Sequence, residues 1–264
     1  MLYRCKIGKA FFFLLLLSPF FFLLLGCSAR QDDSLARIKK AGFIRFAMSC
    51  GYPPFTFCND KNHVVGFDVD VSKEVAKRLG VEAKIVVTEW NGIINGLQSK
   101  SYDGILGSMS VTEERAAAVN FSIPYYYSRC RVIVRKGSPL KDPNKDLLGK
   151  GIGVAKGTTF ENDAKVLGAG NIRLYEDDEQ TLMALQKGAV DAAISDEIVG
   201  IYLAKRKNLT IEPIGEPLRT EKIAVAFRKG EDSLLLHVNK VLKAMQDDGT
   251  LRLLSEKIIK NEYR

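Results

Sequence analysis

A repeated pattern in the middle of the sequence constrains the fold more than any other feature. GLQSKSYDGILGS, residues 96–108, aligns without gaps on ALQKGAVDAAISD, residues 184–196. In both segments a helix-like stretch carrying Leu and Gln leads through a turn and an Asp into an apolar strand. The earlier segments FIRFAMSCGYPPF and GIGVAKGTTF correspond more loosely. The chain is therefore predicted to contain two similar α/β lobes.

Strands and helices are expected to alternate along the rest of the chain. The strands are expected at residues 43–48, 81–87, 102–106, 131–135, 151–154, 190–194 and 223–227. Helices are expected between them, and two more, at 232–247 and 250–260, close the chain. This alternation is typical of α/β folds with largely parallel sheets. Because open α/β sheets bind ligands beyond the carboxyl ends of their strands, two such ends facing each other predict a cleft between the lobes.

The first 26 residues are not expected to belong to this fold. Arg4, Lys6 and Lys9 precede an uncharged run rich in Phe and Leu, which ends in Leu-Leu-Gly before Cys27. A short apolar run behind positive charge predicts a signal peptide, with an uncleaved membrane anchor as the alternative. The L-L-G-C ending resembles the lipobox of bacterial lipoproteins, in which the cysteine is acylated and becomes the first mature residue. Ser28 after the cysteine favours the outer membrane if the cell is Gram-negative.

These features predict a leader at 1–26, a polar tether at 27–33 and a protein that works outside the cytoplasm, tethered to a membrane. Three basic residues of the leader contribute to the formal charge of +8, which leaves +5 on the rest of the chain. The remaining basic residues are scattered and form no long cluster. We interpret them as a solvated surface rather than a nucleic-acid-binding face.

The histidines and cysteines argue against a metal centre. Only two histidines, His63 and His237, occur in the chain, which argues against a histidine metal site or a His-based catalytic triad. No C-x-x-C spacing is present, so no metal and no cofactor is expected. Exported proteins can form disulfides, and Cys50 and Cys58 could pair and leave Cys130 free. Three reduced thiols are the alternative.

Anion-binding groups follow a predicted strand end in the first lobe. Ser110 to Glu113 fits the capping-box pattern S-x-x-E, which marks a helix start. Arg115 lies in the first turn of that helix, where the macrodipole favours anions over cations. Its planar fork suits a carboxylate. The segment predicts either an anion site or an ordinary cap with a surface arginine.

The second lobe offers a comparable turn, KGTTF, at residues 156–160. Thr158 or Thr159 could cap the following helix, and the amides of this turn could hold an anion. The sequence does not match a Walker loop. Asp196 ends a predicted buried strand and could bind an ammonium group or cap the helix that begins at Glu197.

Two aromatic residues, Tyr52 and Trp90, lie near strand ends of the first lobe and could stack on a ligand side chain or pack in the core. Each of these signals has a purely structural alternative. Together they describe a ligand with a carboxylate, an ammonium group and a side chain between rings. Such a ligand is an α-amino acid.

The sequence resembles the family 3 extracellular solute-binding proteins, the amino-acid-binding components of polar amino acid ABC transporters. The motifs that carry the resemblance run in the family's order over essentially the whole chain after the leader. They are YPPF (52–55), GFDVDVSKEVAKRLG (66–80), the EWNGII and GLQSKSYD run (89–103), SMSVTEER (108–115), FSIPYYYS (121–128), GVAKGTT (153–159), DAAISDE (191–197) and VLKAMQDDGTLRLL (241–254).

The resemblance implies two α/β lobes joined by two crossover strands, the fold of type II periplasmic binding proteins. It places Arg115 on the α-carboxylate of the ligand and Asp196 on the α-amino group. The other implied contacts are Ser110 and the amide of Thr158 or Thr159 at the carboxylate, Ser108 at the amino group, Tyr52 and Trp90 beside the side chain, and the backbone of Gly107 at the cleft wall.

One departure from the family bears on the ligand. Many members that bind basic amino acids have an aspartate three residues before the tyrosine of YPPF, where this chain has Ser49. Glu89 or Glu197 could compensate for the missing carboxylate. The expected ligand is therefore arginine or lysine, held by aromatic stacking, or else glutamine or cystine.

The resemblance thus implies a monomeric, lipid-anchored receptor that delivers an amino acid to an ABC permease in the cytoplasmic membrane and catalyses no reaction. Lobe 1 is expected at 34–126 plus 219–264 and lobe 2 at 127–218. Closure is expected at hinges near 126–130 and 217–222. One alternative is a dehydratase of this fold acting on a cyclic carboxylic acid, with Glu89 or Glu197 as the general acid. Another is a ligand-sensing subunit without transport.

Overall fold

The computed structural model describes residues 32–59 and 61–259. These residues lie in one compact unit that begins at Asp32. The predicted leader, the acylation site Cys27 and nearly all of the tether lie outside the described residues. Within the described part of the chain, no helix combines the length and the apolar character needed to cross a membrane.

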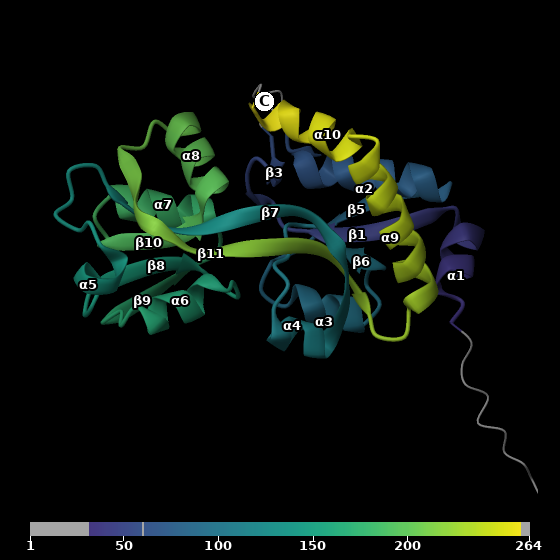
Figure 1. The fold of residues 1–264 in the computed structure, drawn as a ribbon, viewed down its shortest axis with the longest axis horizontal. Helices are drawn as coiled ribbons and strands as arrows, with labels where there is room; N and C mark the ends of the chain where they lie inside the picture. The colour runs from purple at the N-terminus through teal and green to yellow at the C-terminus, as the bar shows by residue number, and fades with distance from the viewer. Residues whose placement is uncertain (1–31, 60, 260–264) are drawn as a thin grey trace, which may run out of the picture. The chain divides into compact units, whose positions relative to one another are not determined.

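An eight-stranded mixed sheet organises the structure (Figure 1). Two long strands, β7 (Val119–Arg135) and β11 (Ile211–Arg228), pair antiparallel at its centre. The first strand group lies beyond β11, in the outward order β6 (Gly104–Ile105), β1 (Phe43–Met48) and β5 (Glu82–Val87). The second strand group lies beyond β7, in the order β10 (Ala192–Asp196), β8 (Gly151–Ala155) and β9 (Asn171–Tyr175).

Strands within each group run parallel, as the alternating pattern predicted. β1 pairs parallel with both β5 and β6, and β8 pairs parallel with both β9 and β10. The predicted α/β class is therefore confirmed. The strands predicted at 131–135 and 223–227 are the ends of the much longer β7 and β11, which cross from one strand group to the other.

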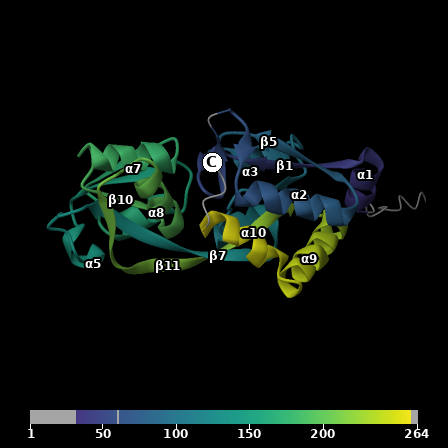
Figure 2. The same cartoon turned by 90° about the horizontal axis from the view of Figure 1, so that it is seen from above.

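Helices accompany each strand group (Figure 2). With the first group are α1 (Ser34–Ala41), α2 (Phe67–Leu79), α3 (Ile93–Gln98), α4 (Glu113–Ala118), α9 (Asp232–Asp247) and α10 (Thr250–Ile259). With the second are α5 (Pro143–Asp146), α6 (Phe160–Val166), α7 (Asp178–Gln186) and α8 (Glu197–Arg206). Helix α9 packs on β7, α1 and α2. A helix from near the C-terminus therefore lies against two helices from the N-terminal part of the fold.

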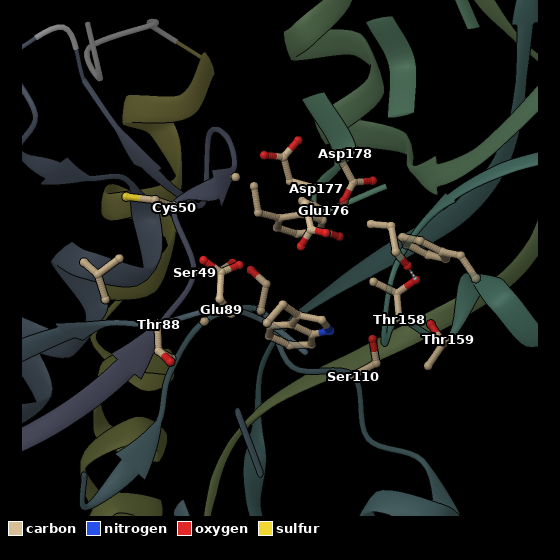
Figure 3. A pocket seen from close by; sticks show the side chains of 18 of the residues that line it. Ser49, Cys50, Thr88, Glu89, Ser110, Thr158, Thr159, Glu176, Asp177 and Asp178 are labelled. Carbon is tan, nitrogen blue, oxygen red and sulfur yellow. Dashed lines mark hydrogen bonds between the residues drawn. The ribbon is translucent and has the colours of Figure 1, made fainter. Parts of the chain in front are cut away.

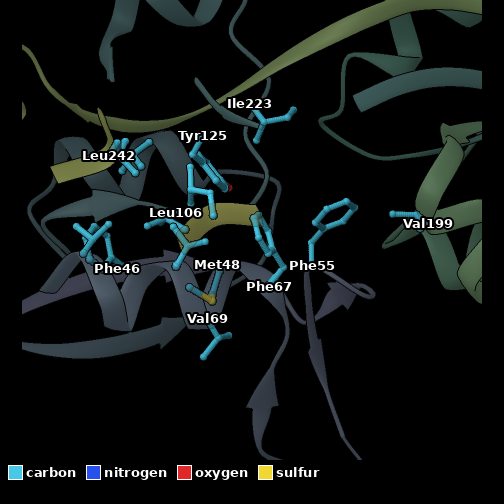
Figure 4. Close-up of a cluster of buried hydrophobic side chains, with 14 of the residues drawn as sticks. Phe46, Met48, Phe55, Phe67, Val69, Leu106, Tyr125, Val199, Ile223 and Leu242 are labelled. Atoms are coloured by element: carbon cyan, nitrogen blue, oxygen red, sulfur yellow. The ribbon is translucent and has the colours of Figure 1, made fainter. Parts of the chain in front are cut away.

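The core follows from the spacing of apolar residues. In α9, Leu234, Val238, Leu242 and Met245 recur at helical spacing and are fully buried. They belong to a cluster that includes Phe46 and Leu106 from the sheet (Figure 4). This cluster holds the carboxyl ends of β1 and β6 in place, and those ends lead into the site described below.

A three-stranded antiparallel sheet extends the loop after β1. Its strands are β2 (Gly51–Tyr52), β3 (Thr56–Cys58) and β4 (Val64–Val65). A disulfide joins Cys50 to Cys58, and Cys130 is a buried free thiol. Of the two alternatives that the sequence left open, the structure therefore has the disulfide and not three reduced thiols. Burial raises the pKa of the Cys130 thiol far above its usual range, so this thiol stays protonated.

Candidate functional site

A cavity of about 300 Å³ opens at the carboxyl ends of strands from both groups (Figure 3). The first strand group supplies the loops after β1, β5 and β6, and the second supplies the loops after β8 and β9. Nine of the ten predicted ligand-binding residues line it: Ser49, Tyr52, Trp90, Gly107, Ser108, Ser110, Arg115, Thr158 and Thr159. The strand-end argument from the sequence therefore placed the cavity correctly.

Arg115 is the cationic residue of the cavity wall. Its guanidinium donates to the carbonyl of Ser110 at 3.0 Å and lies over the ring of Trp90, 5.4 Å from the centroid. Burial lowers its pKa, and the charge of Glu221 opposes that shift. Among residues 32–59 and 61–259, no carboxylate lies within ion-pair distance of this guanidinium. A partly buried arginine without a counter-ion attracts an anion.

The capping pattern at this helix start was assigned to the wrong residue. Thr112, not Ser110, is the N-cap of α4, and its hydroxyl accepts from the amide of Arg115 at 3.1 Å. Ser110 instead forms a β-bridge with Ile223, and its hydroxyl donates to Glu221 at 2.8 Å. Pairing with β11 keeps Ser110 extended, so the helix cannot begin until two residues later.

Neither Thr158 nor Thr159 caps the following helix through its side chain, contrary to the prediction. Thr159 occupies the N-cap position of α6 but makes no side-chain cap hydrogen bond. Its hydroxyl donates to Glu221 at 3.0 Å, whereas the Thr158 hydroxyl donates to the carbonyl of Ala155 at 2.6 Å. No acceptor within the described residues takes the amides of Thr158, Thr159 or Phe160. These amides are available to an anion at the cavity.

Asp196 is the predicted site residue that the structure does not bring to the cavity wall. It caps α8, where one carboxylate oxygen accepts from the amides of Ile198 and Val199, and the other accepts from Ser128. The capping alternative is therefore the role that the structure shows. Asp196 nevertheless remains close to the cavity, because its charge contributes to raising the pKa of the lining residue Tyr52.

An acidic wall, consisting of Glu89, Glu176, Asp177 and Asp178, faces the cavity (Figure 3). Burial raises the pKa of Asp178 to about 7, with further contributions from the charges of Asp196 and Asp177. A hydrogen bond from Ser195 acts against that shift. Of these, only Glu89 was suggested from the sequence. Glu176, Asp177 and Asp178 were not, because nothing in EDD at 176–178 distinguishes a cavity wall from a solvated helix start.

Ser108 and Gly107 are fixed by groups behind the wall. The Ser108 hydroxyl donates to Asp68 at 2.7 Å and accepts from Tyr126 at 2.7 Å. Its backbone has a φ of 56°, a left-handed conformation that serine seldom adopts. A side chain at Gly107 would lie 2.9 Å from Cβ of Met48, so this position requires glycine. Burial raises the pKa of Asp68 to about 6 against hydrogen bonds from Tyr125 and Ser108.

The two glutamates suggested as substitutes for the missing aspartate have different environments. Glu89 lines the cavity and is exposed. Glu197 lies outside it and forms ion pairs with Arg131 at 3.1 Å and Arg129 at 3.4 Å. Only Glu89 is therefore placed to meet a ligand. Within residues 32–59 and 61–259, no group of His, Cys, Asp and Glu side chains is arranged to hold a metal ion.

The chain matches a known protein family over most of its length. The sequence profile of the bacterial extracellular solute-binding proteins, family 3, matches residues 44–261. The L-cystine-binding protein TcyJ of Escherichia coli K12 is 36% identical over 226 residues, which cover 84% of this chain and 85% of TcyJ.

Two groups of solved structures share the fold. An ancestral arginine-binding protein, solved with arginine and with glutamine, has a TM-score of 0.77 and 35% identity, covering 82% of this chain and 97% of its own. An ancestral amino acid-binding protein described as a precursor of cyclohexadienyl dehydratase has a TM-score of 0.79 and 34% identity, covering 85% and 98%. These similarities confirm the predicted fold of two α/β lobes with a cleft.

Proposed function

The chain belongs to family 3 of the bacterial extracellular solute-binding proteins, and on this premise we propose that it is the amino-acid receptor of an ABC uptake transporter. One observation carries the proposal: Arg115 enters the cavity without a carboxylate partner among the described residues, and carboxylates line the opposite wall. A zwitterion with its carboxylate at Arg115 and its ammonium toward the acidic wall satisfies both sides.

The carboxylate of the ligand is held by Arg115 together with the amides of Thr158 and Thr159. The ammonium lies near Asp178 and Asp196, and the charge of Asp196 adds to burial in raising the pKa of Asp178. Burial raises the pKa of Asp196 to about 6. A bound cation relieves that repulsion, so both carboxylates contribute even though only Asp178 lines the cavity.

The side chain of the ligand extends between the aromatic residues toward the rest of the acidic wall. Ser49 adds no charge there, but Glu89, Glu176 and Asp177 do. One guanidinium faces several carboxylates, which favours a ligand with a second cationic group. Arginine, lysine and ornithine have such a group, and glutamine does not. Cystine, the ligand named for TcyJ, has a second ammonium but also a second carboxylate, so it matches this charge pattern less closely.

The remaining parts of the proposal concern location and motion. The receptor works outside the cytoplasm as a monomer, anchored through a lipid on Cys27. Lobe 1 consists of 34–126 and 219–264, lobe 2 of 127–218, and they close on the ligand by bending at the crossover strands. The closed receptor then docks on an ABC permease in the cytoplasmic membrane.

We propose binding without turnover. Similarity to the dehydratase precursor keeps the enzymatic alternative relevant, but that chemistry needs a general acid aimed into the cavity. Glu197 is held in ion pairs outside it, Glu89 is exposed, and the buried carboxyl of Asp178 is hydrogen-bonded to Ser195. Incubation of the purified protein with cyclic carboxylic acids is expected to give no product. Turnover of one of these acids would show that the protein is an enzyme and contradict the proposal of binding without turnover.

A thermal-shift screen tests the proposed function. The purified protein is heated with each of the twenty amino acids, ornithine and cystine. A ligand at a hundred times its Kd stabilises the folded state by about 2.7 kcal/mol and raises the Tm by several degrees. We expect this for one or a few ligands with a second cationic group. If no amino acid shifts the Tm or binds in calorimetry, the receptor proposal is wrong.

A further inference from the structure

Glu221 is a buried charge at the centre of the molecule that the sequence did not single out. It lies on β11 opposite Ser128 of β7, within the predicted hinge at 217–222, and only 4% of its surface is exposed. It does not line the ligand cavity but lies behind Ser110 and Thr159, which do. Its place therefore suits a residue that acts on the site through others.

One oxygen of Glu221 accepts from three donors. The hydroxyl of Ser110 lies at 2.8 Å, that of Thr159 at 3.0 Å and Nη2 of Arg219 at 2.9 Å. Ser110 belongs to the loop after β6 in lobe 1, whereas Thr159 starts α6 in lobe 2. The Thr159 bond thus connects Glu221 to the opposite lobe.

Arg219 adds a second connection between the same elements. It donates to the Thr159 hydroxyl at 2.7 Å and forms an ion pair with Asp163, one turn further along α6. The pKa of Arg219 is raised by its bond to Asp163 and by the charge of Glu221. Two charged residues of one hinge strand therefore hold the start of α6 at two points.

These hydrogen bonds also fix the direction of the hydroxyl protons. Ser110 and Thr159 each have one hydroxyl proton, and each donates it to Glu221. Neither hydroxyl then has a proton left for a ligand carboxylate, which must be held by Arg115 and by backbone amides. The two residues line the cavity, yet their side chains act on one another through Glu221.

We propose that Glu221 is an inter-lobe latch, which holds Thr159 of lobe 2 against the hinge strand and so stabilises the closed arrangement without touching the ligand. The role of the latch in binding rests on the proposed function. Opening the lobes moves α6 away from β11 and breaks the Thr159 bond. The latch therefore slows opening and, with it, ligand release.

The first experiment needs no ligand. Spin labels are attached to cysteines introduced at Lys77 on α2 and Lys165 on α6, both exposed positions on helices of opposite lobes. We expect Glu221→Ala to shift the distance distribution to longer values and Glu221→Gln, which keeps an acceptor, to shift it less. Identical distributions in the original protein and in Glu221→Ala overturn the latch.

A mutant cycle separates a latch from a general loss of packing. Thr159→Val removes the hydroxyl and keeps the shape of the side chain, and it should lengthen the distance in the original protein. In the Glu221→Ala background it should have a smaller effect, because only the bond from Arg219 to the Thr159 hydroxyl is then left to lose. Full additivity of the two changes contradicts the proposal. Thr158→Val is the matched control, because its hydroxyl bonds within lobe 2 and its loss should leave the distances unchanged.

Ligand kinetics complete the test once an amino acid has been found. A hydrogen bond to a charged group contributes roughly tenfold to hundredfold in an equilibrium constant, so Glu221→Ala should speed dissociation by about that factor. Association should change less than about threefold. Unchanged dissociation contradicts the latch. Failure of the amino-acid screen contradicts only the receptor proposal, because the distance measurements are made without ligand.

Discussion

The guanidinium of Arg115 lies over the indole ring of Trp90, with 5.4 Å between the guanidinium carbon and the ring centroid. The indole nitrogen donates to the carbonyl of Gly157 at 3.1 Å, so the ring also contacts the opposite wall of the cavity. The ring fixes the orientation of the guanidinium but leaves its charge uncompensated. We expect an anionic ligand to complete this arrangement.

Arg115→Ala should abolish amino-acid binding while the protein stays folded. Truncating one partner of a buried, hydrogen-bonded charge pair costs about 2–5 kcal/mol, mainly through faster dissociation. Arg115→Lys should recover part of the affinity, because it restores the charge but not the planar fork. Calorimetry measures both variants. Arg252→Ala, an equal charge change at an exposed position on α10 outside the cavity, is the control. Unchanged affinity in Arg115→Ala contradicts the assignment.

Gly51→Ala should weaken binding by obstructing the contact between the lobes. A Cβ at this position would lie 2.4 Å from Cβ of Asp177 across the cavity. Affinity should fall more than about tenfold, the equivalent of 1.4 kcal/mol, with little change in the Tm of the unliganded protein. Gly151→Ala, where the nearest atom is 3.5 Å away, is the control. Normal affinity in the single variant argues against a close approach of the lobes.

Asp178 should make the free energy of unfolding fall as the pH rises. Its folded pKa of about 7 lies above the ordinary aspartate value of 3.8, so the folded state binds more protons between these pH values. This contribution is complete below pH 3.8 and is lost as the pH passes through 7. Urea unfolding between pH 4.5 and 8 should therefore show a smaller decline for Asp178→Asn. Parallel pH profiles for the two proteins contradict the assignment.

The Cys50–Cys58 disulfide should contribute both to stability and to binding. Closing a loop of this size stabilises a fold by about 2–3 kcal/mol in the chain-entropy description, and the double variant Cys50→Ser/Cys58→Ser should lose about that much. Affinity should fall too, because Cys50 and Tyr52 line the cavity together. A reducing agent should lower the stability of the original protein to that of the double variant. It should not change the stability of the double variant itself. Equal stability with and without reductant contradicts this role.

The sequence predicted the parts of the site that local chemistry determines. Arg115 was found because a cation in the first turn of a helix needs an explanation, and the strand ends followed from the repeat at 96–108 and 184–196. The cap at Ser110 was misassigned because the pattern is local, whereas its pairing with Ile223 joins residues far apart in the chain. A four-residue pattern contains no information about pairing with a strand so far away in the sequence.

Buried charges were the other features that the sequence could not predict. Glu221 and Asp178 look like ordinary surface carboxylates in their local segments. Their environments arise only when β11 and α7 meet residues from distant parts of the chain. Asp196 was found for a sound reason, the end of a buried strand, but the structure shows its carboxylate accepting from α8 amides.

The position of β11 between β6 and β7 determines the order in which the chain can assemble during synthesis. Ala226 pairs with Ile105, so β6, the inner strand of the first group, waits for a partner made near the C-terminus. The inner strand of the second group, β10, pairs with β7, which precedes it in the chain, so β8, β9 and β10 need no such wait. Sheets completed by distant segments form slowly. A nascent chain can therefore pair β8, β9 and β10 early, and the domain that starts first is finished last.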